Sequence, residues 1–252
     1  MPLPHRLLLS LALALQGPVW AAGPVVTTGE VRAELVAHAP QGVAPGQPVW
    51  LGLQIEHQPH WHTYWKNPGD SGLPTTLAWQ LPAGVSAGEI AWPTPKKLPV
   101  GPLMNYGYEG MLLLPVPLTV SPSFSGKALD IQLTAQWLVC KDVCIPQQGE
   151  FALSIPVQAS TAMHAASFAA AQAALPQAAP GAQARAELVD QAKTLRVSVS
   201  GLPATLQGRE LAFFAETAGV VEHAARIAAR WDGGTWLADV RCRRSGSRAR
   251  RK

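Results

Sequence analysis

The sequence predicts an all-β protein, a β-sandwich followed by a second, incomplete β-rich region. Apolar and polar residues alternate with a period of two along several short segments, which is typical of half-buried strands. Turns rich in Pro and Gly separate these segments, and the 23 prolines of the 252-residue chain suit turns and edge strands but not long helices. Because no helical segments lie between the predicted strands, a sandwich is favoured over a mixed α/β fold.

Four predicted strands lie in the first part of the chain, at residues 49–56, 111–120, 129–137 and 151–157. The first and third alternate strictly, whereas the second and fourth are apolar runs of strand length. Turns are expected at residues 68–70, 82–84 and 123–126. These elements define a first domain at residues 23–158.

The composition changes after about residue 158. Residues 162–186 are rich in Ala and interrupted by Pro, which allows one short helix before Pro176 and predicts a linker over residues 159–184. Strand-like alternation resumes at residues 195–199 and 211–214. We assign residues 185–240 to a second β-rich domain, which is too short for a complete sandwich.

The first 22 residues have the pattern of a secretory signal peptide. A short cationic segment precedes the apolar run Leu7–Leu15, and small residues near Ala21 and Ala22 offer a cleavage site. The run is shorter than the roughly 20 residues that span a bilayer. We therefore expect a soluble mature protein in the periplasm, where disulfides persist.

Charge excludes some function classes. Residues 241–252 hold seven of the 20 Lys and Arg residues, whereas residues 7–240 hold 12 bases and 16 acids. A nucleic-acid-binding face on the folded body is excluded, because such a face needs clustered Lys and Arg. With 48% hydrophobic and 14% charged residues, the body is not disordered.

The basic tail, residues 241–252, differs in character from the chain before it. One interpretation is an arm that binds nucleic acid or a membrane surface. We favour the alternative that the tail is not native sequence, because an acidic exported body gives such an arm no obvious partner. Cys242 lies in this tail and is left out of the predicted site.

Cys140 and Cys144 carry the most specific chemistry. Three residues separate them, which suits a tight loop at a strand end and a Cα separation of about 4.4–6.8 Å, as a disulfide requires. Closing so small a ring stabilises a fold by only about 2 kcal/mol, against about 4.7 kcal/mol for a hundred-residue loop. The residues alone leave open thiol-disulfide exchange, a structural disulfide and half of a metal site.

Three motifs follow one another along the chain: Trp61–Gly72, Tyr106–Gly110 leading into Leu113–Val116, and Trp137–Pro146. Together they resemble the N-terminal periplasmic domain of the DsbD family of thiol:disulfide interchange proteins. The likeness is greatest to the ScsB-like branch, which is associated with suppression of copper sensitivity. It covers residues 28–158 well and residues 185–240 more loosely.

The resemblance implies an immunoglobulin-like fold with protein-disulfide reductase activity, no cofactor, and a link to cytochrome c biogenesis and copper tolerance. Catalytic Cys140 and Cys144 would accept electrons from a thioredoxin-like donor domain and pass them to a periplasmic thioredoxin-fold isomerase or reductase. By resemblance, Cys144 forms the mixed disulfide and Cys140 resolves it. Full-length members continue into a membrane domain and a C-terminal thioredoxin-like domain, and neither is present in these 252 residues. We therefore expect a truncated relay without its electron source in the same chain.

The family also has a cap loop that shields the sulfurs. By order in the sequence, Met104, Asn105, Tyr106 and Tyr108 are the candidates for the cap, and Tyr64 is the candidate for the pocket beneath it. Packing in the core is the alternative role for these aromatic residues.

Three histidines, His57, His60 and His62, lie close together in the first motif region. His60 and His62 are predicted on one face of a strand, where they could ligate copper or zinc. No third soft ligand is near them in sequence, so no metal site is predicted and these two stay secondary candidates.

Two function classes remain. One is a periplasmic domain that exchanges thiols and disulfides through Cys140 and Cys144. The other is a non-enzymatic exported β-sandwich that binds a protein partner or copper and uses the cysteines only structurally.

Overall fold

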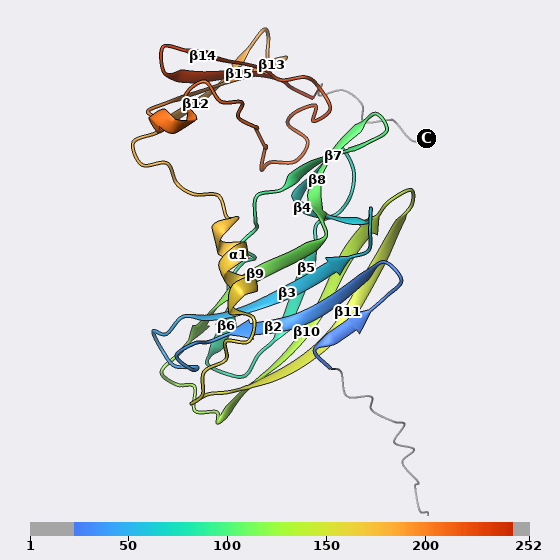
Figure 1. Ribbon diagram of the computed structural model, residues 1–252, viewed down its shortest axis with the longest axis vertical. Helices are drawn as coiled ribbons and strands as arrows, with labels where there is room; N and C mark the ends of the chain where they lie inside the picture. The colour runs from blue at the N-terminus through green and yellow to red at the C-terminus, as the bar shows by residue number, and fades with distance from the viewer. Residues whose placement is uncertain (1–22, 244–252) are drawn as a thin grey trace, which may run out of the picture.

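Two antiparallel sheets face each other in the first part of this computed structural model, which describes residues 23–243 (Figure 1). One sheet has five strands in the order β1 (Val25–Thr27), β2 (Val31–His38), β3 (Val49–His57), β9 (Met111–Val120) and β6 (Val85–Ala87). The other has the order β11 (Cys144–Pro156), β10 (Ala128–Cys140), β4 (His62–Gly69), β8 (Leu103–Glu109) and β7 (Lys96–Val100), with β5 (Thr76–Gln80) also paired to β10. This arrangement confirms the predicted all-β, immunoglobulin-like sandwich.

The core lies between the two sheets. Alternate residues of β3 and β10 point into it, including Leu51, Leu53, Ile131 and Leu133, each exposed by 2% or less. The polar residues between them face outward, as the period of two requires. The predicted strands at 49–56, 111–120, 129–137 and 151–157 are therefore confirmed, although β10 runs on to Cys140 and β4 extends into the predicted turn as far as Gly69.

A short helix, α1 (Ala165–Ala173), covers the outer face of the five-stranded sheet (Figure 1). Phe168 of α1 is 1% exposed and packs with Val36 of β2 and Leu113 of β9. Gly52 of β3 leaves room for this ring, because a Cβ there would lie 3.3 Å from its Cζ atom and 2.6 Å from Cδ1 of Leu113. The helix thus lies in the predicted linker but is packed on the sandwich.

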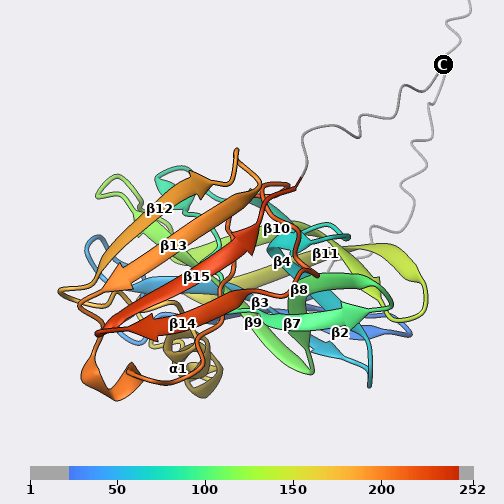
Figure 2. The ribbon, with the colours of Figure 1, turned by 90° about the horizontal axis from the view of Figure 1, so that it is seen from above.

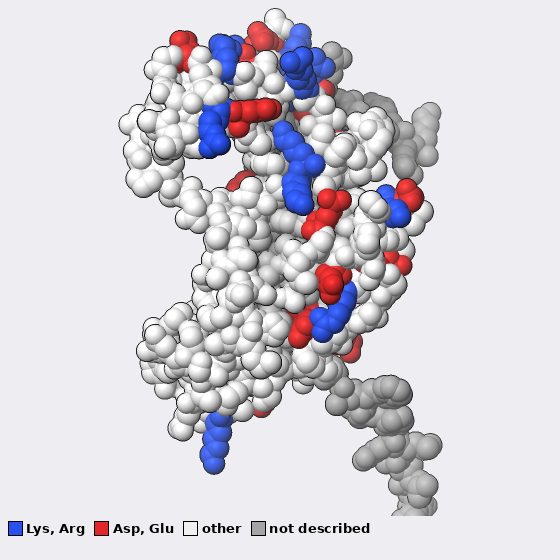
Figure 3. All heavy atoms as spheres, in the orientation of Figure 1, with Lys and Arg blue, Asp and Glu red and all other residues white. Residues whose placement is uncertain are grey.

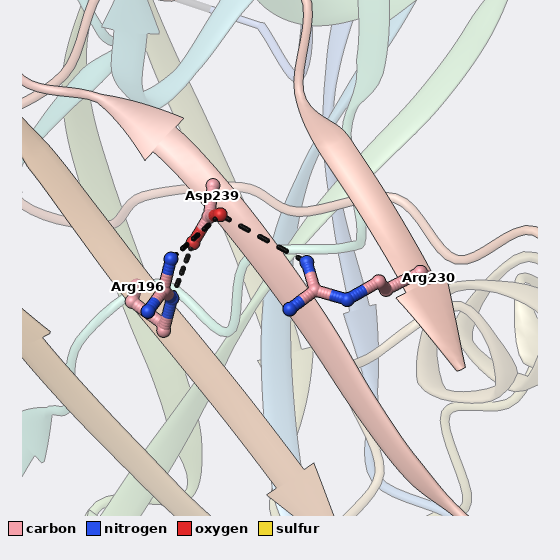
Figure 4. A network of polar contacts seen from close by, with 3 residues as sticks. All are labelled: Arg196, Arg230 and Asp239. Atoms are coloured by element: carbon pink, nitrogen blue, oxygen red, sulfur yellow. Dashed lines mark hydrogen bonds and ion pairs between the residues drawn. The ribbon is translucent and has the colours of Figure 1, made fainter. Parts of the chain in front are cut away.

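A third sheet, of four antiparallel strands, lies across the end of the sandwich (Figures 1 and 2). Its order is β12 (Gln183–Val189), β13 (Thr194–Ser200), β15 (Thr235–Arg241) and β14 (Ala228–Asp232). Asp239 of β15 links this strand to both of its neighbours, β13 and β14: it accepts 2.7 and 3.0 Å hydrogen bonds from Arg196 and lies 3.9 Å from Arg230 (Figure 4). A single 3-10 turn, η1 (Ala204–Leu206), follows β13.

The predicted strand at residues 211–214 is wrong, because this segment has no regular secondary structure. Its aromatic residues serve a different purpose. Phe214 packs edge-on against Tyr106 and Trp65 of the sandwich, with ring centroids 4.9 and 6.2 Å apart. Next to it, the Asn67 amide donates a 2.7 Å hydrogen bond to the carbonyl oxygen of Ala215. The apolar residues of this segment therefore dock the third sheet onto the first domain.

The start of the basic tail belongs to the third sheet. Arg241 is the last residue of β15, and Cys242 forms an isolated bridge with Val221. Residues 244–252 and the predicted signal peptide, residues 1–22, lie outside the described residues. On the face seen in Figure 3, basic and acidic side chains are interspersed and most of the sandwich surface carries neither.

Candidate redox site

The two cysteines lie at the tip of the longest hairpin. β10 and β11 pair along all 13 residues of each strand, and Cys140 stands directly opposite Cys144 across a turn of three residues. Their sulfurs form a disulfide with a Cα separation of 4.2 Å. This separation is slightly below the range of about 4.4–6.8 Å expected from the sequence. It is close to the roughly 4.5 Å of a non-hydrogen-bonded antiparallel pair.

The two cysteines differ in exposure. Val139 points into the core, so Cys140 lies on the outer face of the sheet, where neighbouring side chains leave it only 2% exposed. Cys144 is exposed, and so is its neighbour Val143, at 61%. An incoming group therefore has access to the Cys144 side of the bond.

Tyr64 of β4 lies under the disulfide, and its hydroxyl oxygen is 3.8 Å from Sγ of Cys144. The ring is 1% exposed because the segment after β4 covers it: a Cβ at Gly72, where φ is +108°, would collide with the ring. Burial raises the pKa of the Tyr64 phenol, so the hydroxyl keeps its proton at neutral pH and can donate it to sulfur.

His62 stands next to the buried cysteine. It pairs across the strands with Cys140 of β10 on one side and with Glu109 of β8 on the other. Its ring is 5% exposed and meets Tyr64 edge-on at 5.2 Å. Burial lowers the pKa of His62, and the negative charge of Glu109 opposes that shift only in part. The imidazole is therefore neutral at pH 7.

A hollow of about 510 Å³ opens beside the cysteine turn. Lys141 and Asp142 of the turn form one wall, and strand β7 with Glu109 forms the other. Charges of both signs line it, so the hollow has no strong preference for an anion or a cation.

The residues predicted to form the cap lie in strand β8, and other contacts hold them through their side chains or, for Met104, through the backbone. Asn105 accepts hydrogen bonds from the backbone N–H and hydroxyl of Ser71, at 3.1 and 3.0 Å. Tyr106 packs edge-on against Phe214 and His223, and the Tyr108 hydroxyl donates a 2.7 Å hydrogen bond to the carbonyl of Pro93. The backbone N–H of Met104 donates to Asp70 at 2.9 Å. These contacts fit the alternative of structural packing.

The histidines do not form the strand face predicted for them. His60 lies in the turn before β4 with φ of +71°, so only His62 is in the strand. His57 is held by a 2.7 Å hydrogen bond between Nδ1 and the Gly110 carbonyl and a 3.0 Å bond between Nε2 and the Thr63 hydroxyl. Within residues 23–243, no cluster of three or more His, Cys, Asp or Glu residues could hold a metal ion.

Residues 32–156 match the family model described as the thiol:disulfide interchange protein DsbD, N-terminal. This region is a DsbD-family N-terminal domain. The match contains the two sheets of the sandwich apart from strand β1, together with Tyr64 and the Cys140–Cys144 disulfide. The DsbD family carries out thiol-disulfide exchange with thioredoxin-fold partners.

The DsbD-family domain and the sheet after it also resemble a solved structure. The crystal structure of the N-terminal periplasmic domain of ScsB from Proteus mirabilis matches with a TM-score of 0.52 and 18% sequence identity, over 88% of this chain and 85% of that chain. No match was found among curated proteins. Across residues 23–243, no helix is long and apolar enough to cross a membrane.

The sequence places His62 and Glu109 in two of the family motifs, and it predicts a site role only for His62, as a secondary metal candidate. The spacing of His62 and Tyr64, two residues apart, places both on one face of a strand. What the spacing does not give is the neighbouring strand, because the pairing of β4 with Cys140 joins residues nearly 80 positions apart.

Proposed function

We propose that this domain relays reducing equivalents in the periplasm through the Cys140–Cys144 pair. The observation that carries the proposal is the unequal exposure of the two cysteines: Cys144 is exposed, whereas Cys140 is 2% exposed. Thiol-disulfide exchange requires an attacking thiolate to reach one sulfur along the axis of the bond. The geometry favours Cys144 as the sulfur that is attacked.

The relay has two balanced half-reactions. A thiolate of a thioredoxin-like donor attacks Cys144, the bond to Cys140 breaks, and Cys140 leaves as a thiolate that takes up a proton. The second donor thiol then displaces Cys144, so the donor becomes a disulfide and the domain a dithiol. In the second half-reaction, the Cys144 thiolate attacks the disulfide of a thioredoxin-fold acceptor, and Cys140 resolves the mixed disulfide. Two electrons and two protons pass to the acceptor.

The alternative is a structural bond that only holds the hairpin together. Two features argue against it. A ring of about five residues stabilises a fold by about 2 kcal/mol in the loop-entropy estimate. The hairpin already has 13 paired residues on each strand and an apolar inner face in the main core. The hairpin therefore has little need of the bond for stability.

The periplasmic location and the identity of the partners rest on resemblance. The ScsB domain of similar fold is described as periplasmic, and the predicted signal peptide would export this chain to the same compartment. Mass spectrometry of the mature N-terminus tests this, with cleavage near Ala21 or Ala22 as the expected result. An intact Met1 on membrane-bound protein would contradict it.

The central experiment measures the redox equilibrium of the bond. We expect the disulfide to exchange reversibly with glutathione buffers, with a potential above the roughly −300 mV typical of structural disulfides. Thiol trapping followed by mass spectrometry gives the reduced fraction at each poise. A bond that stays oxidised at strongly reducing poise in the folded protein would support the structural alternative.

Two single variants then test which sulfur is attacked. The Cys140→Ala variant keeps the exposed thiol and is expected to trap a stable mixed disulfide with an oxidised thioredoxin-fold protein. The Cys144→Ala variant keeps only the buried thiol and is expected to trap little. The reverse pattern would exchange the two roles, and no trapping by either would refute the relay.

A further inference from the structure

The proposed relay leaves open how the buried thiol loses and gains its proton. Cys140 is 2% exposed, so bulk water reaches its sulfur poorly. A thiol must ionise before it attacks a disulfide, and a buried thiolate without a partner is costly. A proton acceptor close to Cys140 would remove this obstacle.

His62 is in the right place to be that acceptor. It stands directly opposite Cys140 across the strands, a position in which Cβ atoms lie about 4.5–5.5 Å apart. Both side chains lie on the outer face of the sheet and are buried. Nε2 of His62 is buried without a hydrogen-bond partner, although buried polar atoms of this kind are nearly always paired. A partner is therefore missing while the disulfide is closed.

We propose that His62 exchanges a proton with the Cys140 thiol during the proposed relay, accepting one when Cys140 attacks and supplying one when Cys140 leaves. When the disulfide opens, Cys140 gains an S–H group next to the unpartnered nitrogen. In the resolving step, the proton moves from Sγ of Cys140 to the imidazole, and the resulting thiolate forms the bond to Cys144 as the acceptor sulfur departs with its electron pair. Between the two steps the imidazolium releases its proton to solvent, which leaves the ring neutral. In the reverse step, the leaving Cys140 thiolate takes up a proton that His62 relays from solvent. The inference rests on the proposed function, since it assigns a role within the same site.

The surroundings suit a base that is neutral between turnovers. Burial keeps the pKa of His62 below its usual value, and Glu109 on the neighbouring strand would steady the imidazolium once it forms. Other titratable or charged side chains also surround the ring. Tyr64 is its phenol neighbour and His57 its imidazole neighbour. The hollow adds His60, Lys96, Lys97, Lys141 and Asp142. The lysines oppose protonation and Asp142 favours it, so the lining has no dominant sign.

The test separates attack from resolution in one reaction. Reduced protein carrying Cys242→Ser is mixed with one equivalent of an aromatic disulfide that releases a coloured thiolate. The first release reports attack by the exposed Cys144, and the second reports resolution by Cys140. For His62→Gln, we expect the second phase to slow about 10-fold or more at pH 7, with the first phase within two-fold. His60→Gln is the matched control, because His60 lines the same hollow, and it should alter neither phase.

The pH profile distinguishes proton transfer from a structural effect. With His62 present, the second phase should rise with pH and level off below pH 6.5, whereas in His62→Gln it should keep rising above that pH. Equal slowing of both phases, or a second phase within two-fold of the parent, would overturn the proposal. No first phase in the parent protein would instead refute the relay itself.

A measurement on the unaltered protein guards against a variant that does not fold. The His62 ring is titrated by NMR in the oxidised and the reduced protein. We expect its pKa to differ between the two states, because a thiol exists beside the ring in only one of them. Identical titration curves would overturn the proposal.

Discussion

Removing the Tyr64 hydroxyl should make Cys144 a weaker acid. The hydroxyl lies 3.8 Å from Sγ of Cys144, within the range of hydrogen bonds to sulfur but long. A hydrogen bond to a charged group contributes about 1.5–3 kcal/mol at good geometry, so we take about 0.7–1.4 kcal/mol for this long contact with the thiolate. At 1.36 kcal/mol per pKa unit, Tyr64→Phe should raise the pKa of the Cys144 thiol by about 0.5–1 unit.

The effect on rate is smaller than the effect on ionisation. The thiolate fraction at pH 7 falls by about three- to ten-fold, but each remaining thiolate is more nucleophilic, with a Brønsted coefficient of about 0.4–0.5. The net loss in attack rate should be about two- to four-fold. The assay is the pH dependence of alkylation in a protein carrying Cys140→Ser and Cys242→Ser, which leaves Cys144 as its single thiol.

Tyr108→Phe is the matched control. It also removes a hydroxyl from a buried tyrosine, but that hydroxyl bonds to the Pro93 carbonyl and not to a cysteine. The control should lose about 1 kcal/mol of stability and leave the pKa of Cys144 unchanged. If Tyr64→Phe leaves the pKa of the Cys144 thiol unchanged, Tyr64 is not a hydrogen-bond donor to this sulfur.

Three further changes test the scaffold. Gly72→Ala should destabilise the fold by about 1–3 kcal/mol in urea unfolding, because φ is +108° and the new Cβ meets the Tyr64 ring; an unchanged midpoint would contradict this close approach. Phe168→Ala should cost about 3–5 kcal/mol by the same measurement, since the ring is 1% exposed and anchors α1; a loss under about 1 kcal/mol would mean that the helix is not held by this contact. His223 has a pKa lowered by burial, so the unfolded chain binds its proton first and stability should fall as pH drops from 6.5 through the folded pKa. His223→Phe, which keeps the packing on Tyr106, should reduce that slope, to which buried His57 and His62 also contribute, and an equally steep slope in the variant would exclude a contribution from His223.

Local pattern was enough to predict five of the 15 strands within residues 23–243 and the proximity of Cys140 and Cys144. β3, β10 and β13 alternate with a clear period of two, and each is confirmed within a few residues. Pattern failed where a residue packs on a distant part of the chain. Residues 211–214 have the apolar content of a strand, but Phe214 packs against Tyr106 and so docks the third sheet onto the sandwich. Periodicity reports that a side chain is buried but does not report what buries it.

The sequence by itself determined the class of fold, the spacing of Cys140 and Cys144, and the motifs that mark the DsbD family. Only the tertiary structure decided that Cys140 is buried while Cys144 is exposed, and that His62 and Tyr64 are the side chains beside the pair. The reason is that spacing along the chain fixes the geometry within one hairpin, where the two cysteines are four residues apart. The side chains that surround each sulfur come instead from β4, which reaches this hairpin only through long-range strand pairing, and no local pattern encodes that partner.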